Sequence, residues 1–597
     1  MNETTLLLLA EESVRLAWLG AVFLLLASLP DLWRALREVG LRRLLPWIGL
    51  TVLAVGSRLL VEPSFVHENR HGEMMYLWLL QSGHSLHGAG WFETYRLILA
   101  FGESMEAVFL TSAVLGGLSC LLAGLFSMVL LGAKPREGLL TGLILAMTPV
   151  HIRVSASESP LVLAAFLTIA SSTAVAFGLR EKRSTLVVAG FLLAVVLSQT
   201  RSIYMVFPAF LVALPFVLPR VNGKRPNLRL AVGGAALSFL LLIPRLCAIF
   251  LVAAEGDALF GLSIRNLANQ LFSEANIALN PRLFPVALTV LGLAGFAFVA
   301  YRTPATAAWM GALLAILLCW FLSMNSNLGA IIRFQHSFLF LIAALAARGT
   351  FELLSLLKRA PHRLALSAGL LAAAVTTAIP GARIIGYPFD KDVELAWLKN
   401  EARAALPKKG VLVLPGYRAF HEGRILLYFV HEVLPDRGVG WTIVRQAPDA
   451  PLHPLILRTK EDVFYYRGLW AYEFVSGELP HRDPPTTREE RYRANPFFDH
   501  ERTSPGMAAW AGTEDSMIRP EITALESRLV LEPVEDLPPH TFEARPYHRW
   551  IVPQRKVTIS FHRVVGADGV VLFGDPEEKP DGPPDSNGAE RLSFDGE

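Results

Sequence analysis

The chain has 597 residues, of which 53% are hydrophobic and only 18% are charged. The mean hydropathy of +0.42 excludes an ordinary soluble domain and predicts a polytopic membrane protein. The formal net charge of +3 is small for this length and is spread along the chain, so the sequence points to no nucleic-acid partner.

About twelve segments are apolar enough to cross a bilayer as helices, a crossing that takes roughly 20 mainly apolar residues. The first is an additional helix that precedes the others. The fourth and the sixth are short and could be tilted or re-entrant. The expected spans are 14–29, 46–61, 106–131, 139–150, 160–177, 185–197, 203–217, 230–252, 284–300, 305–324, 330–347 and 364–379.

Arginine and lysine gather in every second connection between these spans. The positive-inside rule makes the basic connections cytoplasmic. We therefore expect a multi-pass protein of the inner (plasma) membrane, with the amino terminus, the first outer loop (62–105) and everything after residue 379 on the extracytoplasmic face. The basic connections contain Arg34, Arg37, Arg42, Arg43, Lys134, Arg136, Arg180, Lys182, Arg183, Arg220, Lys224, Arg225, Arg229, Arg302, Arg348, Lys358, Arg359 and Arg363.

The first outer loop carries a charged cluster, His-Glu-Asn-Arg-His-Gly-Glu at 67–73. An ionisable side chain held at membrane depth costs about 2.5 to 3.5 kcal/mol or more, so the cluster suggests chemistry, although a solvated loop would contain the same residues. Two amphipathic stretches of this loop, 74–80 and 91–99, could lie along the lipid interface or pack against neighbouring helices.

Polar residues also occupy the other connections on this side. Guanidinium groups suit phosphate or diphosphate, because their fork of donors pairs with phosphate oxygens and stays charged. Each single arginine could instead reach lipid headgroups, but the convergence of several favours a site. The residues expected to bind substrate are His67, Arg70, His71, Tyr76, Arg153, Glu158, Arg201, Arg265, Arg333 and His336.

Three short motifs lie beside the predicted spans: Glu73-Met74-Met75-Tyr76, the stretch 149–160, and Ile332-Arg333-Phe334. Together they resemble the GT-C superfamily of membrane glycosyltransferases, of the protein mannosyltransferase and aminoarabinose transferase type. The resemblance covers about residues 46–379. It implies transfer of a sugar from a polyprenyl-phosphate donor to a lipid, glycan or protein acceptor outside the cytoplasm, with a first-loop carboxylate at the catalytic centre.

Two positions depart from the family pattern. The usual Asp-Glu pair is Gly72-Glu73 here, and the tyrosine that often follows the late arginine is Phe334. Glu68 and Glu73 therefore remain alternatives for the base that takes the acceptor's proton. Arg201, Arg333 and Arg265 would hold the leaving phosphate.

No cofactor is certain from the sequence. A divalent metal could bind, but hydrogen bonding fits the spacing of the available ligands better. Those ligands are His67, His71, Glu158 and His336.

Beyond the last span the composition changes to that of a soluble α/β domain. Strands are expected at 411–414, 441–444 and 557–561, and a helix at 422–433. The end of the chain is rich in Pro, Gly and acidic residues and is expected to be disordered. The predicted regions are 1–45 (additional helix and basic loop), 46–380 (membrane core), 381–574 (extracytoplasmic domain) and 575–597 (tail).

Two other classes of function fit part of the pattern. Twelve spans would suit a secondary transporter, but no internal repeat is evident and the ionisable residues gather at one face rather than at the midplane. A noncatalytic scaffold for cell-envelope glycan assembly would account for the irregular acidic pair. In each case membrane lipid is the surrounding partner.

Overall fold

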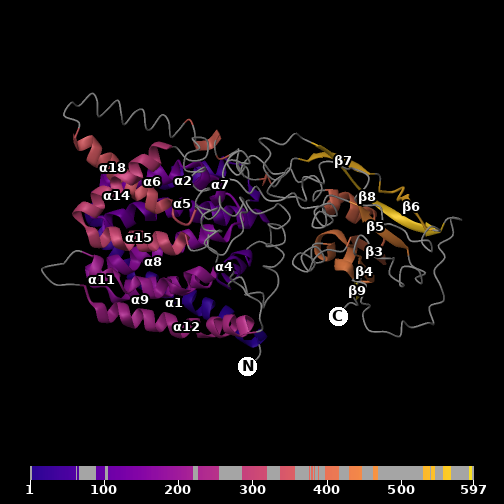
Figure 1. The fold of residues 1–597 in the computed structure, drawn as a ribbon, viewed down its shortest axis with the longest axis horizontal. Helices are drawn as coiled ribbons and strands as arrows, with labels where there is room; N and C mark the ends of the chain where they lie inside the picture. Colours follow the sequence, from indigo (N-terminus) through magenta and orange to yellow (C-terminus); the bar gives the residue numbers. More distant parts are fainter. Residues whose placement is uncertain are drawn as a thin grey trace, which may run out of the picture. The chain divides into compact units, whose positions relative to one another are not determined.

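The computed structural model divides into two compact units, Met1–Phe389 and Asp390–Glu597, and each is described here by itself. Figure 1 shows the long helices of the first unit side by side. The residues that the structure describes are 3–61, 63–65, 89–100, 105–218, 226–254, 286–318, 336–356, 376, 378–380, 382, 387–388, 397–415, 429–446, 462–467, 529–537, 539–544, 555–566 and 590–593.

The first unit is a helical bundle with one short β-bridge, β1 (Ser64–Phe65) paired with β2 (Tyr387–Pro388). Its longer helices are formed by apolar segments that are long enough to cross a bilayer. These elements are α1 (Glu3–Val39), α2 (Leu41–Leu59), α4 (Ala89–Leu99), α5 (Met105–Leu130), α6 (Pro135–Ala146), α7 (Pro149–Ser155), α8 (Pro160–Glu181), α9 (Ser184–Ser198), α12 (Leu228–Ala254), α14 (Val286–Arg302), α15 (Pro304–Leu318) and α18 (Leu339–Leu356).

Five of the described helices are long and apolar enough to cross a membrane, and six if the bent pair α6–α7 forms one span. Shorter apolar helices occupy Ser184–Ser198, Ala287–Arg302 and Pro304–Leu317. The described residues thus contain fewer full-length spans than the twelve expected. The predicted span 364–379 lies largely outside the described residues.

Helix α8 shows how the sequence sets the limits of a span. The Ser159 side chain accepts a hydrogen bond from the Leu161 backbone N–H, and Pro160 occupies the first turn, where no intrahelical N–H bond is lost. The helix ends at Glu181, and the next residue, Lys182, has the left-handed conformation common at helix ends (φ 58°). Most side chains between these limits are buried.

The segment predicted as one span at 139–150 is broken in the structure. Helix α6 ends at Ala146, and α7 begins at Pro149 after a bend of 68°. Proline lacks the backbone N–H that a continuous helix would need, and it fits the first turn of a new one. The bend therefore separates the polar stretch that begins at Pro149 from the apolar helix before it.

The predicted span 203–217 is also not one helix. It consists of three short pieces: η2 (Ser202–Val206), α10 (Phe207–Leu211) and α11 (Leu214–Val217). Proline lies in the first turn of both α10 and α11. Two prolines within eight residues break the hydrogen-bond ladder that a continuous span needs, so the expectation of a single helix here was wrong.

Ion pairs connect three helices at the end of the bundle where α6 begins. Arg302 of α14 donates two hydrogen bonds to the Glu352 carboxylate, at 2.7 and 3.0 Å. Arg348 of α18 lies 3.0 Å from Glu352 and 3.3 Å from Glu137, a buried residue in the first turn of α6. Both arginines belong to the basic connections that the positive-inside rule predicts to be cytoplasmic.

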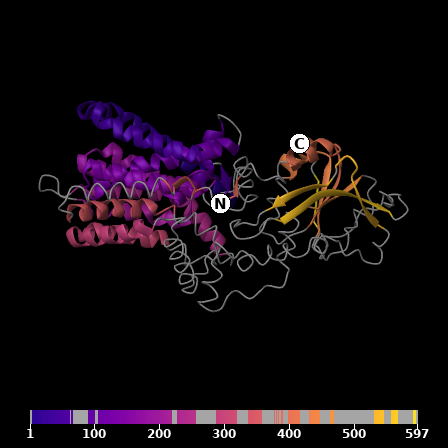
Figure 2. The same cartoon turned by 90° about the horizontal axis from the view of Figure 1, so that it is seen from above.

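The second unit contains a seven-stranded sheet, drawn as orange to yellow arrows in Figure 2. The strand order is β6-β8-β5-β3-β4-β9, and β7 pairs with β8. Strand β3 is parallel to β4 and β5, and the other pairings are antiparallel. Successive residues Val411, Leu412 and Val413 of β3 are all buried, so both faces of this central strand are covered. The strands are β3 (Gly410–Pro415), β4 (Trp441–Gln446), β5 (Val463–Arg467), β6 (Leu529–Pro533), β7 (His540–Ala544), β8 (Arg555–Gly566) and β9 (Glu590–Ser593).

Most sequence expectations for this unit that fall on described residues agree with the structure. The strands predicted at 411–414, 441–444 and 557–561 lie within β3, β4 and β8. The helix predicted at 422–433 is described only at its end, where Phe429–Val433 form a π-helical turn. The tail was expected to be disordered, but Glu590–Ser593 pair with β4 as an edge strand.

Candidate functional site

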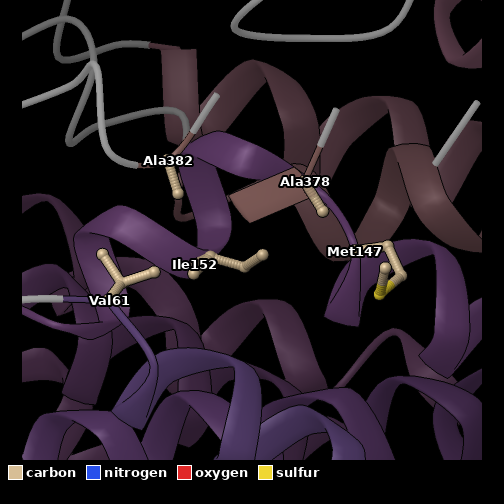
Figure 3. Close-up of a cluster of buried hydrophobic side chains, with 5 residues drawn as sticks. All are labelled: Val61, Met147, Ile152, Ala378 and Ala382. Carbon is tan, nitrogen blue, oxygen red and sulfur yellow. The ribbon is translucent and has the colours of Figure 1, made fainter. Parts of the chain in front are cut away.

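Helix α7 brings the polar residues of the 149–160 stretch to the end of the bundle where α2 ends (Figure 1). All seven residues of this helix are buried. Ile152 packs in an apolar cluster with Val61, Met147, Ala378 and Ala382 (Figure 3). This packing holds the backbone of α7, and so limits where its polar side chains can lie.

Arg58, in the last turn of α2, is a buried cation beside α7; the residue is 1% exposed. Its Nη1 donates to the Ala54 carbonyl at 2.6 Å and to the Ser57 hydroxyl at 2.9 Å. Its Nη2 donates to His151 Nδ1 and lies 3.4 Å from Cys120 Sγ. Among the described residues, its Nε has no hydrogen-bond partner, and no carboxylate pairs with the guanidinium group. A buried charge without a counter-ion is costly and therefore marks a candidate site.

Two histidines stack next to Arg58. The rings of His151 and His336 have centroids 4.2 Å apart and an interplanar angle of 23°. Ser155 Oγ donates to the His151 carbonyl at 2.6 Å, which is the ordinary backbone bond of a helical serine. Both ring nitrogens of His336 are buried and have no hydrogen-bond partner in the part of the chain that the structure describes. His336 therefore has unused donor and acceptor capacity.

The polar cluster continues from His336 through Ser337 to Tyr204 and Arg201. The Tyr204 hydroxyl interacts with the Ser337 side chain. The distance and angle between them do not make a hydrogen bond, and neither hydroxyl has another partner among the described residues. The Tyr204 backbone N–H donates to the Arg201 carbonyl at 3.0 Å. Arg201 is partly exposed, and its Nε is buried without a hydrogen-bond partner among the described residues. The structure thus joins two predicted site residues, Arg201 and His336, through two that were not predicted.

Arg153 and Glu158 are both fully buried. Arg153 Nε donates to the Ala382 carbonyl at 2.8 Å, so part of its role is to hold the chain at that residue. The Glu158 carboxylate interacts with Tyr95 of α4, whose hydroxyl lies 2.7 Å from Ser112 Oγ. Burial raises the pKa of Tyr95, so its hydroxyl keeps its proton at neutral pH.

Helix α4 is the second amphipathic stretch expected in the first outer loop. Trp91, Phe92 and Tyr95 are buried, and the rings of Trp91 and Tyr95 lie 4.9 Å apart. Leu97, at 51%, is the one exposed residue between Ala89 and Leu99. Of the two alternatives for 91–99, this burial favours packing against neighbouring helices.

Charged contacts tie α4 to α1. The buried Glu93 carboxylate pairs with Arg15 of α1 and with Arg96 of α4 itself. Trp18 Nε1 donates to Thr94 Oγ1 at 2.7 Å. The additional first helix therefore helps to position α4, the helix that carries Tyr95.

Many of the predicted site residues lie outside the part of the chain that the structure describes. Among the described residues, no group of three or more His, Cys, Asp or Glu side chains could hold a metal ion. Of the four residues considered as metal ligands, only Glu158 and His336 are described. The predicted site residues outside the described ranges are His67, Glu68, Arg70, His71, Glu73, Tyr76, Arg265 and Arg333.

Arg58, Tyr204 and Ser337 were not among the predicted site residues. Arg58 could have been found, because it is a charged residue inside the predicted span 46–61. Tyr204 and Ser337 carry no such signal, because a hydroxyl at the end of an apolar run is common and only the packed structure shows that it lacks a partner.

No protein-family model matches the chain, and no curated protein matches it. Among solved structures, the chain is similar to the apo form of the oligosaccharyltransferase from Archaeoglobus fulgidus. The two share 11% sequence identity, with a TM-score of 0.44. The similarity covers 73% of this chain and 70% of the archaeal chain.

Proposed function

We propose that this protein transfers a sugar from a polyprenyl-phosphate carrier to a lipid, glycan or protein acceptor outside the cytoplasm. The observation that carries the proposal is the pair of arginines, Arg58 and Arg201, near one end of an apolar helical bundle without a carboxylate partner among the described residues. An anionic headgroup attached to a long apolar chain would satisfy both the cations and the membrane setting.

The chemistry assigns a role to each kind of residue. Displacing a polyprenyl phosphate from an anomeric carbon needs a base for the acceptor's proton and cations for the leaving phosphate. Arg201 is partly exposed and can contact a phosphate directly. Arg58 is buried against His151, which stacks on His336, so it contributes positive charge to the site without contacting the phosphate. Arg333 and Arg265 remain proposed phosphate ligands, and Glu68 or Glu73 the proposed base. The motifs that resemble the GT-C superfamily support the same assignment.

Replacing Arg201 tests the phosphate assignment. Arg201→Ala is expected to weaken binding of an undecaprenyl-phosphate-linked sugar by roughly 10-fold to 150-fold, the range for a lost hydrogen bond to a charged group. Arg201→Lys should recover only part of this affinity, because lysine keeps the charge but loses the planar fork. Arg333→Ala should weaken binding in the same direction. Affinity is measured with the full-length protein in detergent micelles.

The control variant is Arg180→Ala, which removes an exposed arginine at the end of α8. It should leave carrier binding unchanged while making the same change in net charge. If Arg201→Ala and Arg333→Ala both bind the carrier as tightly as the natural protein does, the phosphate is held elsewhere and the proposed function loses its support.

The proposal also requires the first outer loop and the second unit to lie outside the cytoplasm. In a variant whose native cysteines are replaced by alanine, single cysteines at Asn69 and Asp483 should react with a membrane-impermeant thiol reagent in intact cells. A cysteine at Gly223 should react only after the cells are opened, because its connection is basic. Protection of the first two positions in intact cells would reverse the topology.

A further inference from the structure

We propose that His336, Ser337 and Tyr204 form a subsite for the hydroxyl groups of the transferred sugar. This inference rests on the proposed function and adds to it the place where the sugar, as distinct from the phosphate, is recognised. The three side chains are 1%, 2% and 0% exposed, respectively. All of their side-chain nitrogen and oxygen atoms are buried without a hydrogen-bond partner among the described residues.

Unpartnered buried polar atoms are unusual in folded proteins. More than nine in ten such groups find a partner in the protein or in ordered water, because leaving one unpaired costs about 1 to 3 kcal/mol. Four such atoms lie close together here. They are the two ring nitrogens of His336, the hydroxyl of the next residue, Ser337, and the hydroxyl of Tyr204, which interacts with Ser337. Such a group of adjacent unused donors and acceptors fits a ligand that carries several hydroxyls.

The contacts of Arg58 and His151 indicate why His336 is suited to a sugar hydroxyl rather than to an anion such as phosphate. Arginine can only donate hydrogen bonds, so His151 Nδ1 must accept the bond from Arg58, and His151 is therefore neutral. His336 stacks on His151 and is 1% exposed, and such burial favours the neutral imidazole. A neutral His336 has one N–H donor and one nitrogen acceptor, the complement of a hydroxyl.

The position of the subsite agrees with the geometry of a sugar phosphate. Arg201, the proposed phosphate ligand, accepts a backbone hydrogen bond from Tyr204 at 3.0 Å, and the Tyr204 side chain interacts with Ser337. A ligand whose phosphate contacts Arg201 would thus place its attached sugar near the three neutral side chains. A bare polyprenyl phosphate would use only the arginine.

The experiment compares two kinds of probe on the full-length protein in detergent. One is undecaprenyl phosphate alone, and the other is undecaprenyl phosphate linked to glucose, mannose, galactose or an aminopentose. At least one sugar-bearing carrier should bind more tightly than the bare carrier. Tyr204→Phe and Ser337→Ala should each reduce that difference by about threefold to tenfold, the range for one hydrogen bond between neutral groups, without changing affinity for the bare carrier.

Two further variants make the result specific. His336→Asn keeps one donor and one acceptor at the position and should retain part of the sugar-dependent affinity. Ser172→Ala removes a buried hydroxyl inside α8 that also has no partner among the described residues, and it should change neither affinity.

The possible failures are distinguishable. If no sugar makes the carrier bind more tightly, or if Tyr204→Phe and Ser337→Ala keep the full sugar-dependent difference, the subsite is overturned while the carrier assignment stands. If the natural protein binds neither the bare carrier nor any sugar-bearing one, the proposed function fails, and the subsite fails with it.

Discussion

Glu68→Gln or Glu73→Gln is expected to lower the turnover of sugar transfer by roughly 100-fold to 10,000-fold, the usual contribution of a positioned general base. The amide keeps the shape of the side chain and much of its hydrogen bonding, but it cannot accept a proton at neutral pH. Affinity for the sugar-bearing carrier should change little, because the base acts in the transition state rather than in binding. Single-turnover rates with saturating carrier separate the two effects.

The comparison variants decide between three carboxylates. Glu158→Gln tests a fully buried carboxylate, and Glu106→Gln removes an exposed carboxylate from the first turn of α5. Glu106→Gln should transfer sugar at the normal rate. If both first-loop variants and their double variant also do so, the base is not in this loop, and a transporter or scaffold function becomes the better explanation.

The sequence predicted the long apolar helices well because a bilayer imposes a simple length requirement. The predicted segments 106–131, 160–177 and 230–252 correspond to α5, α8 and α12. The central strands of the second unit were also predictable, since Val411-Leu412-Val413 is a short apolar run that ends in proline and glycine. In both cases local composition is enough to determine the element.

The breaks in the helices and the polar cluster depend on more than local composition. Pro149, Pro208 and Pro215 were visible in the sequence, but a proline can kink a span or end it, and the neighbouring helices decide which. The contact of Arg58 with His151 joins residues 93 positions apart. The stacking of His336 on His151 joins residues from still more distant segments, and a single sequence contains no signal for such pairs.

Gly295→Ala and Gly349→Ala are each expected to destabilise the helical unit by about 1 to 3 kcal/mol or more, the cost of overfilling a packed interface. Helices α14 and α18 approach closely at these two glycines. A Cβ added at Gly295 would overlap the Leu345 carbonyl oxygen, and one added at Gly349 would overlap that of Leu291. Backbone atoms cannot turn aside as a side chain can, so the helices must separate. Unfolding in mixed micelles with increasing denaturing detergent measures the loss.

Gly311→Ala in α15 is the matched control, because a Cβ there would meet no atom within 4 Å. It should be neutral or stabilise the protein by up to about 1 kcal/mol, since alanine is the better helix former. Helix α18 begins at Leu339, two residues after Ser337, so separation of α14 and α18 should also displace the proposed sugar subsite. Gly349→Ala should therefore weaken the sugar-dependent part of carrier binding even at temperatures where the protein stays folded. Equal stability of the Gly349 and Gly311 variants would show that α14 and α18 are not packed this closely.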